Sequence, residues 1–127
     1  MSSNKFSIEY PINTSVKVLF QRISTISGLS EWFADNVNIQ NNILTFFWEN
    51  SSDKAKIIKK VKNKLIRFQW IDDHGTDEYF EFQIMVDEIT KDIALIVIDF
   101  AEDEDDKEEA ILLWNSQIND LKKLIGG

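Results

Sequence analysis

The only histidine of the chain, His74, lies in the segment DDHGTDE, residues 72–78. The acids around it are Asp72, Asp73, Asp77 and Glu78. Carboxylates with one imidazole can hold a divalent cation, and a histidine can shuttle protons near neutral pH. The same residue types also make an ordinary solvated turn between two strands. Because the chain has no second histidine and no cysteine to complete a ligand set, we expect a turn, with no metal site and no cofactor.

Asp99 is the second residue that could do chemistry, because it interrupts the apolar run ALIVIDFA. Period-two alternation places it on the same strand face as Leu95 and Val97. A carboxylate on a covered face must be paired or protonated. Arg67, within LIRFQW, is the candidate partner. Such a pair would either orient a ligand or form a structural cross-strand ion pair, and we expect the structural pair.

The sequence shows no nucleophile with its base. Serines and threonines are frequent, but the spacing around His74 does not indicate a catalytic triad. Only four glycines are present, and two of them end the chain, so there is no glycine-rich phosphate loop. We therefore predict no catalytic residues.

Aromatic residues form the third candidate site. Three pairs stand at positions i and i+2 of an expected strand, so each pair shares one sheet face: Phe46 and Trp48, Phe68 and Trp70, Phe80 and Phe82. Each buried ring removes about 150–250 Å² from water. These rings either line a pocket for a small apolar or aromatic ligand or fill a dense core. Trp32 and Phe33, adjacent in GLSEWFAD, leave the same alternative open, and we expect one ring to seal the core and the other to face a cavity.

Charge is unevenly distributed along the chain. The net charge of −8 argues against binding to nucleic acid or anionic lipid. Half of the 14 cationic residues nevertheless fall between Lys54 and Arg67. The hairpin of residues 54–64 either meets an acidic protein partner or protects a strand from edge-to-edge aggregation. Residues 102–109, EDEDDKEE, fit the start of a helix and its solvation.

The length of 127 residues predicts one domain, and 43% hydrophobic with 28% charged residues is a globular composition. The absence of cysteine excludes disulfides and thiolate sites. No segment approaches the ~20 apolar residues of a membrane span, and the N-terminal residues do not resemble a signal peptide. We therefore expect a cytoplasmic monomer or weak dimer without membrane insertion.

Hydrophobic periodicity predicts the elements that position these residues. Residues 6–12 alternate as a strand whose Pro11 indicates an edge or an end. Residues 13–15, NTS, predict the N-cap of a helix, and Gly28 is expected to end or redirect it before a short second helix, LSEWF. From about residue 35 to 101 the pattern is an antiparallel meander of six strands with an NN turn at 41–42 and an irregularity at Ile57-Ile58. A long helix follows, with Ile111, Trp114, Ile118, Leu121 and Ile125 on one face and Gly126 at its end.

This order resembles the START-like superfamily, also called the helix-grip or SRPBCC fold, and within it the activators of heat-shock chaperone ATPase and their homologues. The segment NTSVKVLFQRISTISGLSEWF resembles that family's opening signature through Val18, Phe20 and Trp32. The segment WNSQINDLKKLI resembles its terminal helix. The glycine usual before the tryptophan is Leu113 here, and we expect this leucine to crowd the helix against the sheet.

The resemblance implies one α+β domain, residues 1–127, in which a curved antiparallel sheet wraps a long C-terminal helix and leaves a cavity between them. Its expected use is binding of a small hydrophobic ligand; a chaperone-cofactor-like interaction module and a cyclase or dehydratase are the alternatives. The residues expected to line the cavity are Trp32, Phe33, Phe46, Trp48, Phe68, Trp70, Phe82, Trp114 and Ile118.

Overall fold

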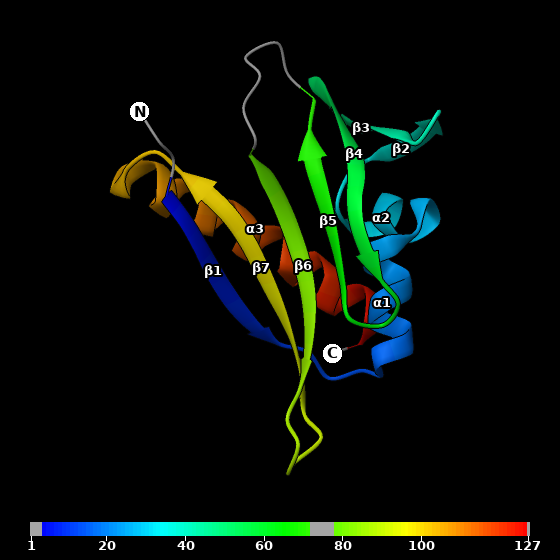
Figure 1. Ribbon diagram of the computed structural model, residues 1–127, viewed down its shortest axis with the longest axis vertical. Coiled ribbons are helices and arrows are strands. Elements are labelled where there is room, and N and C mark those ends of the chain that lie inside the picture. Colours follow the sequence, from blue (N-terminus) through cyan, green and yellow to red (C-terminus); the bar gives the residue numbers. More distant parts are fainter. Residues whose placement is uncertain (1–3, 72–77, 127) are drawn as a thin grey trace.

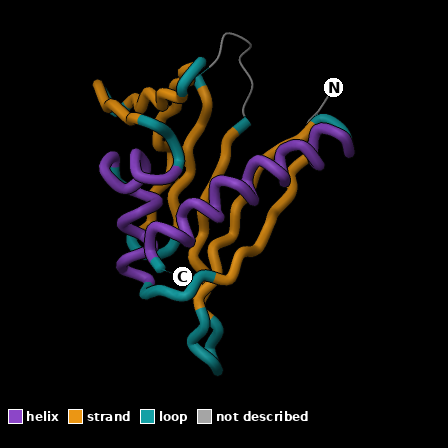
Figure 2. The backbone as a smooth tube through the Cα atoms, turned by 180° about the vertical axis from the view of Figure 1, so that it is seen from behind, coloured by secondary structure: helices purple, strands orange, loops and turns teal. Residues whose placement is uncertain are grey.

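The computed structural model describes residues 4–71 and 78–126. In these residues, three helices cover one face of a curved antiparallel sheet of seven strands (Figures 1 and 2). The strand order is β1-β7-β6-β5-β4-β3-β2. The predicted α+β class, with the long C-terminal helix lying across the sheet, is confirmed. The elements are β1 (Asn4–Pro11), α1 (Val16–Ser24), α2 (Ile26–Trp32), β2 (Asn36–Gln40), β3 (Ile43–Trp48), β4 (Ser51–Val61), β5 (Leu65–Trp70), β6 (Tyr79–Val86), β7 (Ile93–Ala101) and α3 (Glu104–Ile125).

The ends of α3 follow from its sequence. The Asp103 side chain accepts a 2.8 Å hydrogen bond from the backbone N–H of Asp106 and caps the first turn. Gly126 closes the helix in the left-handed conformation at φ 75°. Between these caps, α3 buries Trp114, Ile118 and Leu121 against the sheet. The predicted apolar face and C-terminal glycine are therefore confirmed.

The break between α1 and α2 lies at Thr25, so the predicted role of Gly28 is wrong. Thr25 is extended, and its Oγ1 accepts a 2.9 Å hydrogen bond from the backbone N–H of Gly28, which caps α2. Gly28 lies buried in the first turn of α2. A Cβ there would overlap the backbone oxygen of Gln21 and lie 2.7 Å from Cα of Arg22. Glycine is needed because the two helices approach each other closely, and not because the chain ends a helix there.

The sheet contains the predicted turn and irregularity. Asn41 and Asn42 have φ values of 53° and 65°, as a two-residue turn between β2 and β3 requires. The register between β4 and β5 shifts between Ile57 and Lys59. Ile58 is exposed beside this shift. Both the NN turn and the bulge are thus confirmed, and β1, which ends at Pro11, lies at the sheet edge.

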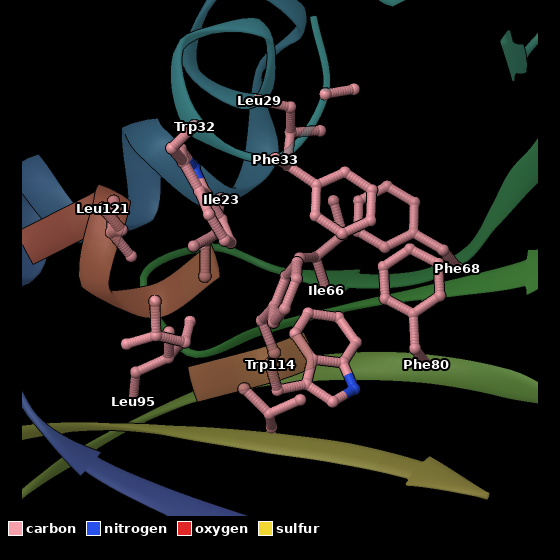
Figure 3. Packing of buried hydrophobic residues seen from close by; sticks show 14 of the residues in the cluster. Ile23, Leu29, Trp32, Phe33, Ile66, Phe68, Phe80, Leu95, Trp114 and Leu121 are labelled. Atoms are coloured by element: carbon pink, nitrogen blue, oxygen red, sulfur yellow. The ribbon is translucent and has the colours of Figure 1, made fainter. Parts of the chain in front are cut away.

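The core fills most of the space between sheet and helices. Phe46, Phe68, Phe80 and Phe82 on the inner sheet face are fully buried. Figure 3 shows the rings of Phe33, Phe80 and Trp114 gathered between the loop after α2, β6 and α3. Dense ring packing of this kind explains how helices and sheet are held together. None of the helices among the described residues has the length and apolar character of a membrane span.

Candidate functional site

A groove of about 1100 Å³ lies between α2 with the loop after it, the inner face of β3–β5, and α3. All four tryptophans of the chain line this groove, one from each of four elements. They are Trp32 on α2, Trp48 on β3, Trp70 on β5 and Trp114 on α3. Tryptophans separated by up to 82 positions in the sequence are thus brought to one concave surface.

Strand alternation explains why two of them reach the groove. Trp48 and Trp70 are the last residues of β3 and β5. Each shares the inner face with a phenylalanine two residues earlier, which is fully buried, whereas both tryptophans stay half-buried. The inner sheet face therefore passes from sealed core to open groove within two residues.

Phe33 connects the core with the groove. Its ring centroid lies 4.9 Å from that of Phe46 and 5.4 Å from that of Phe80. Its backbone oxygen accepts hydrogen bonds from Trp48 Nε1 at 3.0 Å and from Gln117 Nε2 at 3.2 Å. These contacts join the loop after α2 to β3 and α3. Trp32 and Phe33 are both buried and both border the groove, so the structure does not divide the two rings between core and cavity as expected.

Three indole N–H groups are satisfied within the protein. Trp32 Nε1 donates to the backbone oxygen of Arg22 at 2.9 Å, and Trp114 Nε1 donates to Asp99 Oδ2 at 2.8 Å. The third is the bond from Trp48 described above. These bonds fix the orientation of the rings. What the three tryptophans can offer a guest is therefore their apolar surface and the negative potential of their ring faces.

Asp99 does not pair with Arg67 as the sequence suggested. Its Oδ1 accepts a 2.8 Å hydrogen bond from the backbone N–H of Phe100, and its Oδ2 accepts the bond from Trp114. Burial raises the pKa of the Asp99 carboxyl, and the negative charges of Glu78 and Asp106 act in the same direction, while the two hydrogen bonds oppose the shift. Asp99 is thus a partly buried acid in the wall of the groove.

Arg67 lies on the opposite face of the sheet, because it alternates with the inward Phe68. Its Nε donates to Glu81 Oε1 at 2.5 Å, directly across the β5–β6 ladder. Glu81 also accepts from Gln83 Nε2 at 2.5 Å and is only 1% exposed. This buried acid was missed from the sequence, since its partner follows from strand register rather than from local pattern.

The charged side chains that line the groove are mostly acids. They are Glu31, Asp35, Asp53, Asp99 and Asp120, with Lys123 as the one base among the described residues. Glu31 forms an ion pair with Arg22. Asp35, Asp53 and Asp120 are exposed and have no side-chain hydrogen bond or ion pair to another described residue.

The nine residues expected to line a cavity fall into two groups. Trp32, Phe33, Trp48, Trp70 and Trp114 border the groove. Phe46, Phe68, Phe82 and Ile118 are enclosed in the core and do not reach it. Leu113, expected to crowd α3 against the sheet, is instead 63% exposed and lines the groove. Position 113 precedes the inward Trp114 by one residue, about 100° around the helix, which points its side chain to the groove rather than into the core.

The histidine segment lies outside the described residues, apart from Glu78. Within residues 4–71 and 78–126, no group of three or more histidine, cysteine, aspartate or glutamate side chains is placed to hold a metal ion. Lysines at 54, 56, 59, 60, 62 and 64 are all exposed along β4 and the turn after it.

Comparison with known proteins places these features in context. A model of the START-like superfamily domain matches residues 1–127. The solution NMR structure of BfR322 from Bacteroides fragilis is 35% identical in sequence, with 98% of this chain and 92% of that chain covered and a TM-score of 0.69. No curated protein shows significant similarity to the chain.

Two more distant structures share the fold. The Aha1 dimer from Colwellia psychrerythraea is 16% identical, with 96% of both chains covered and a TM-score of 0.82. CalU16 from Micromonospora echinospora is 13% identical, with 97% of this chain and 74% of that chain covered and a TM-score of 0.72.

Proposed function

Since the chain belongs to the START-like superfamily, we propose that it binds a small hydrophobic molecule in the groove between α2, the inner sheet face and α3. The observation that carries this proposal is the convergence of all four tryptophans on that groove. Ligand sites are typically concave, mostly apolar and of several hundred cubic ångströms, with a few polar groups. The groove is concave, and nine of its 18 lining residues are apolar, four of them tryptophans.

The half-buried rings supply the binding energy. Trp48 and Trp70 leave part of their indole surface open to water on the groove side. Covering about 100 Å² of apolar surface contributes about 2.5 kcal/mol. Two such rings on the groove wall give a guest useful affinity, and the hydrogen bond from Trp48 to the backbone oxygen of Phe33 already holds one of them in place.

The test is a thermal-unfolding screen against lipids, sterols and aromatic polyketides. A ligand at about 100 times its Kd adds about 2.7 kcal/mol to the free energy of unfolding. We expect members of at least one of these classes to raise the melting temperature in a concentration-dependent way. A panel without any shift would contradict the proposal.

Two neighbouring leucines on α3 provide a matched pair of variants. Leu113 lines the groove, whereas Leu112 is 70% exposed and does not line it. Leu113→Trp should fill part of the groove and weaken binding. Leu112→Trp should leave binding unchanged, and the two variants should unfold at similar temperatures because both side chains lie at the surface. Equal loss of binding in both variants would place the ligand elsewhere.

The lysine-rich strand supports a second candidate, an interaction with an acidic protein. Lys54, Lys56, Lys59 and Lys60 are exposed on β4, and none forms an ion pair with another described residue. Reversing charge at Lys59 and Lys60 to glutamate should weaken capture of such a partner and flatten its salt dependence. The same double variant should bind a groove ligand as the parent protein does.

A further inference from the structure

We propose that the groove selects ligands that carry a positive charge, such as an amine or quaternary ammonium group attached to an apolar or aromatic body. This inference rests on the proposed function, because it specifies the chemistry of the ligand for the same groove. It is carried by two features that meet there: the walls of tryptophan and the sign of the charges beside them.

The tryptophan walls favour cations over anions. An indole face carries negative electrostatic potential, and tryptophan is the strongest of the aromatic side chains in attracting a cation. Trp32, Trp48 and Trp114 direct their N–H groups to protein acceptors. Three of the four indoles therefore have no free donor with which to bind the carboxylate or phosphate of an anionic ligand.

The charged side chains act in the same direction. Among the described residues that line the groove, five are acids and one, Lys123, is a base. Glu31 is neutralised by Arg22, but neither Asp35 nor Asp53 forms an ion pair with any residue that the structure describes. Asp35 reaches the groove from the loop after α2, and Asp53 reaches it from the inner face of β4. Acids by themselves would form only a solvated rim. Acids next to four tryptophans on a concave surface are complementary to a ligand that has both an apolar body and a positive charge.

The position of Asp53 supports this interpretation. Asp53 pairs with Phe46 in the β3–β4 ladder, so its carboxylate stands on the inner face of the sheet. The neighbouring Lys54 and Lys56 flank the buried Ala55, and alternation directs both to the outer face. At the groove end of β4 the charges are therefore separated, with Asp53 on the groove side and Lys54 and Lys56 on the outer side.

Three matched probes test the inference by isothermal titration calorimetry of the full chain at low salt. They are 4-phenylbutyltrimethylammonium, 4-phenylbutanol and 4-phenylbutanoate, which share an aromatic body and differ in the charge of the head group. We expect the cation to bind roughly 3- to 30-fold more tightly than the alcohol and the anion to bind most weakly. Added salt should weaken the binding of the cation and leave the affinity for the alcohol unchanged.

Variants assign the charge preference to the groove. Asp35→Asn combined with Asp53→Asn should remove most of the advantage of the cation and leave the affinity for the alcohol unchanged. Asp92→Asn, an exposed acid on the β6–β7 connection that does not line the groove, is the matched control and should change neither. Tryptophan fluorescence gives a second readout, since every tryptophan of the chain borders the groove.

The outcomes separate this inference from the proposed function. An alcohol that binds as tightly as the cation, or an anion that binds best, would overturn the charge preference while the hydrophobic site stands. A cation advantage that the Asp35 and Asp53 substitutions leave undiminished would also overturn it. No heat and no fluorescence change with any of the three probes would contradict the hydrophobic site itself, and the charge preference with it.

Discussion

Trp114 on α3 and Asp99 on β7 are joined by a 2.8 Å hydrogen bond from the indole Nε1 to a carboxylate oxygen at the wall of the groove. The bond ties the C-terminal helix to the sheet, and it requires a partly buried acid. Asp99 therefore stabilises the contact between α3 and the sheet, but keeping its carboxylate charged in a partly buried position is unfavourable. The balance between the two depends on pH.

The first prediction concerns that pH dependence. Burial raises the pKa of Asp99 above its ordinary value. Between the two values the folded protein holds a proton that the unfolded chain has released, so the free energy of unfolding falls as pH rises through this window. Each pKa unit of difference between the folded and the unfolded state changes the free energy of unfolding by about 1.4 kcal/mol. Urea denaturation over a pH series should show this slope in the parent protein and not in Asp99→Asn.

The slope, and not the absolute stability, is the quantity to compare. Asparagine removes the charge but keeps only one acceptor oxygen for two donors, Trp114 Nε1 and the backbone N–H of Phe100. Asp87 provides an internal contrast, because backbone hydrogen bonds from Thr90 and Ile89 lower the pKa of its carboxyl. The contribution of Asp87 to the free energy of unfolding is therefore lost as the pH falls below the ordinary pKa of an aspartate. An Asp99→Asn protein with the parent's slope would refute the assignment.

The second prediction concerns Phe33. Its ring contacts those of Phe46, Trp48 and Phe80, among others, in a position that is 4% exposed. Phe33→Ala should lower the free energy of unfolding by about 3–5 kcal/mol, since it leaves a cavity between core and groove. Phe47→Ala, which removes a more exposed ring on the outer side of β3, should cost much less. Chemical denaturation of both variants measures the difference, and equal losses would contradict the assigned packing.

Local patterns in the sequence were sufficient for most of the fold. Ser15 and Asp103 are helix caps recognisable from residue type, and the Asn41-Asn42 turn follows from the tolerance of asparagine for positive φ. Period-two alternation placed Phe46 and Phe68 on the inner face. Gly28 was misassigned because its requirement is the distance between α1 and α2, and that distance is a property of tertiary packing which no local pattern contains.

The site was predictable only in part for the same reason. Alternation establishes which sheet face Trp48 and Trp70 occupy, but not where along the strand the core ends and the groove begins. The boundary depends on how far α3 and the loop after α2 extend over the sheet. Asp35, Asp53 and Leu113 line the groove through that arrangement. In the sequence, Asp35 and Asp53 are unremarkable polar residues, and Leu113 stands out only because it replaces the family's usual glycine.

The third prediction concerns the ion pair on the outer face. Glu81 is almost fully buried and accepts from both Arg67 and Gln83. Removing one partner of a buried pair leaves an uncompensated charge, so Arg67→Met should cost about 3–5 kcal/mol. Substituting methionine at both positions 67 and 81 should recover most of that loss. Double-mutant analysis by urea denaturation tests this, and a double variant as unstable as the single one would show that the Arg67 side chain stabilises the sheet by packing instead.

The fourth prediction separates two glycines by the reason each is needed. At Gly28 a Cβ would lie 2.7 Å from Cα of Arg22, so Gly28→Ala should cost about 1–3 kcal/mol through overpacking. At Gly126 nothing lies within 4 Å of an added Cβ, but φ is 75°, so Gly126→Ala should cost about 1–2 kcal/mol through backbone strain alone. Asparagine tolerates the left-handed conformation, and it should therefore recover stability at position 126 and worsen it at position 28. Thermal unfolding of the four variants measures these differences. A neutral Gly28→Ala would mean that α1 and α2 are packed less closely than the structure describes, and the placement of Trp32 at the groove depends on that packing.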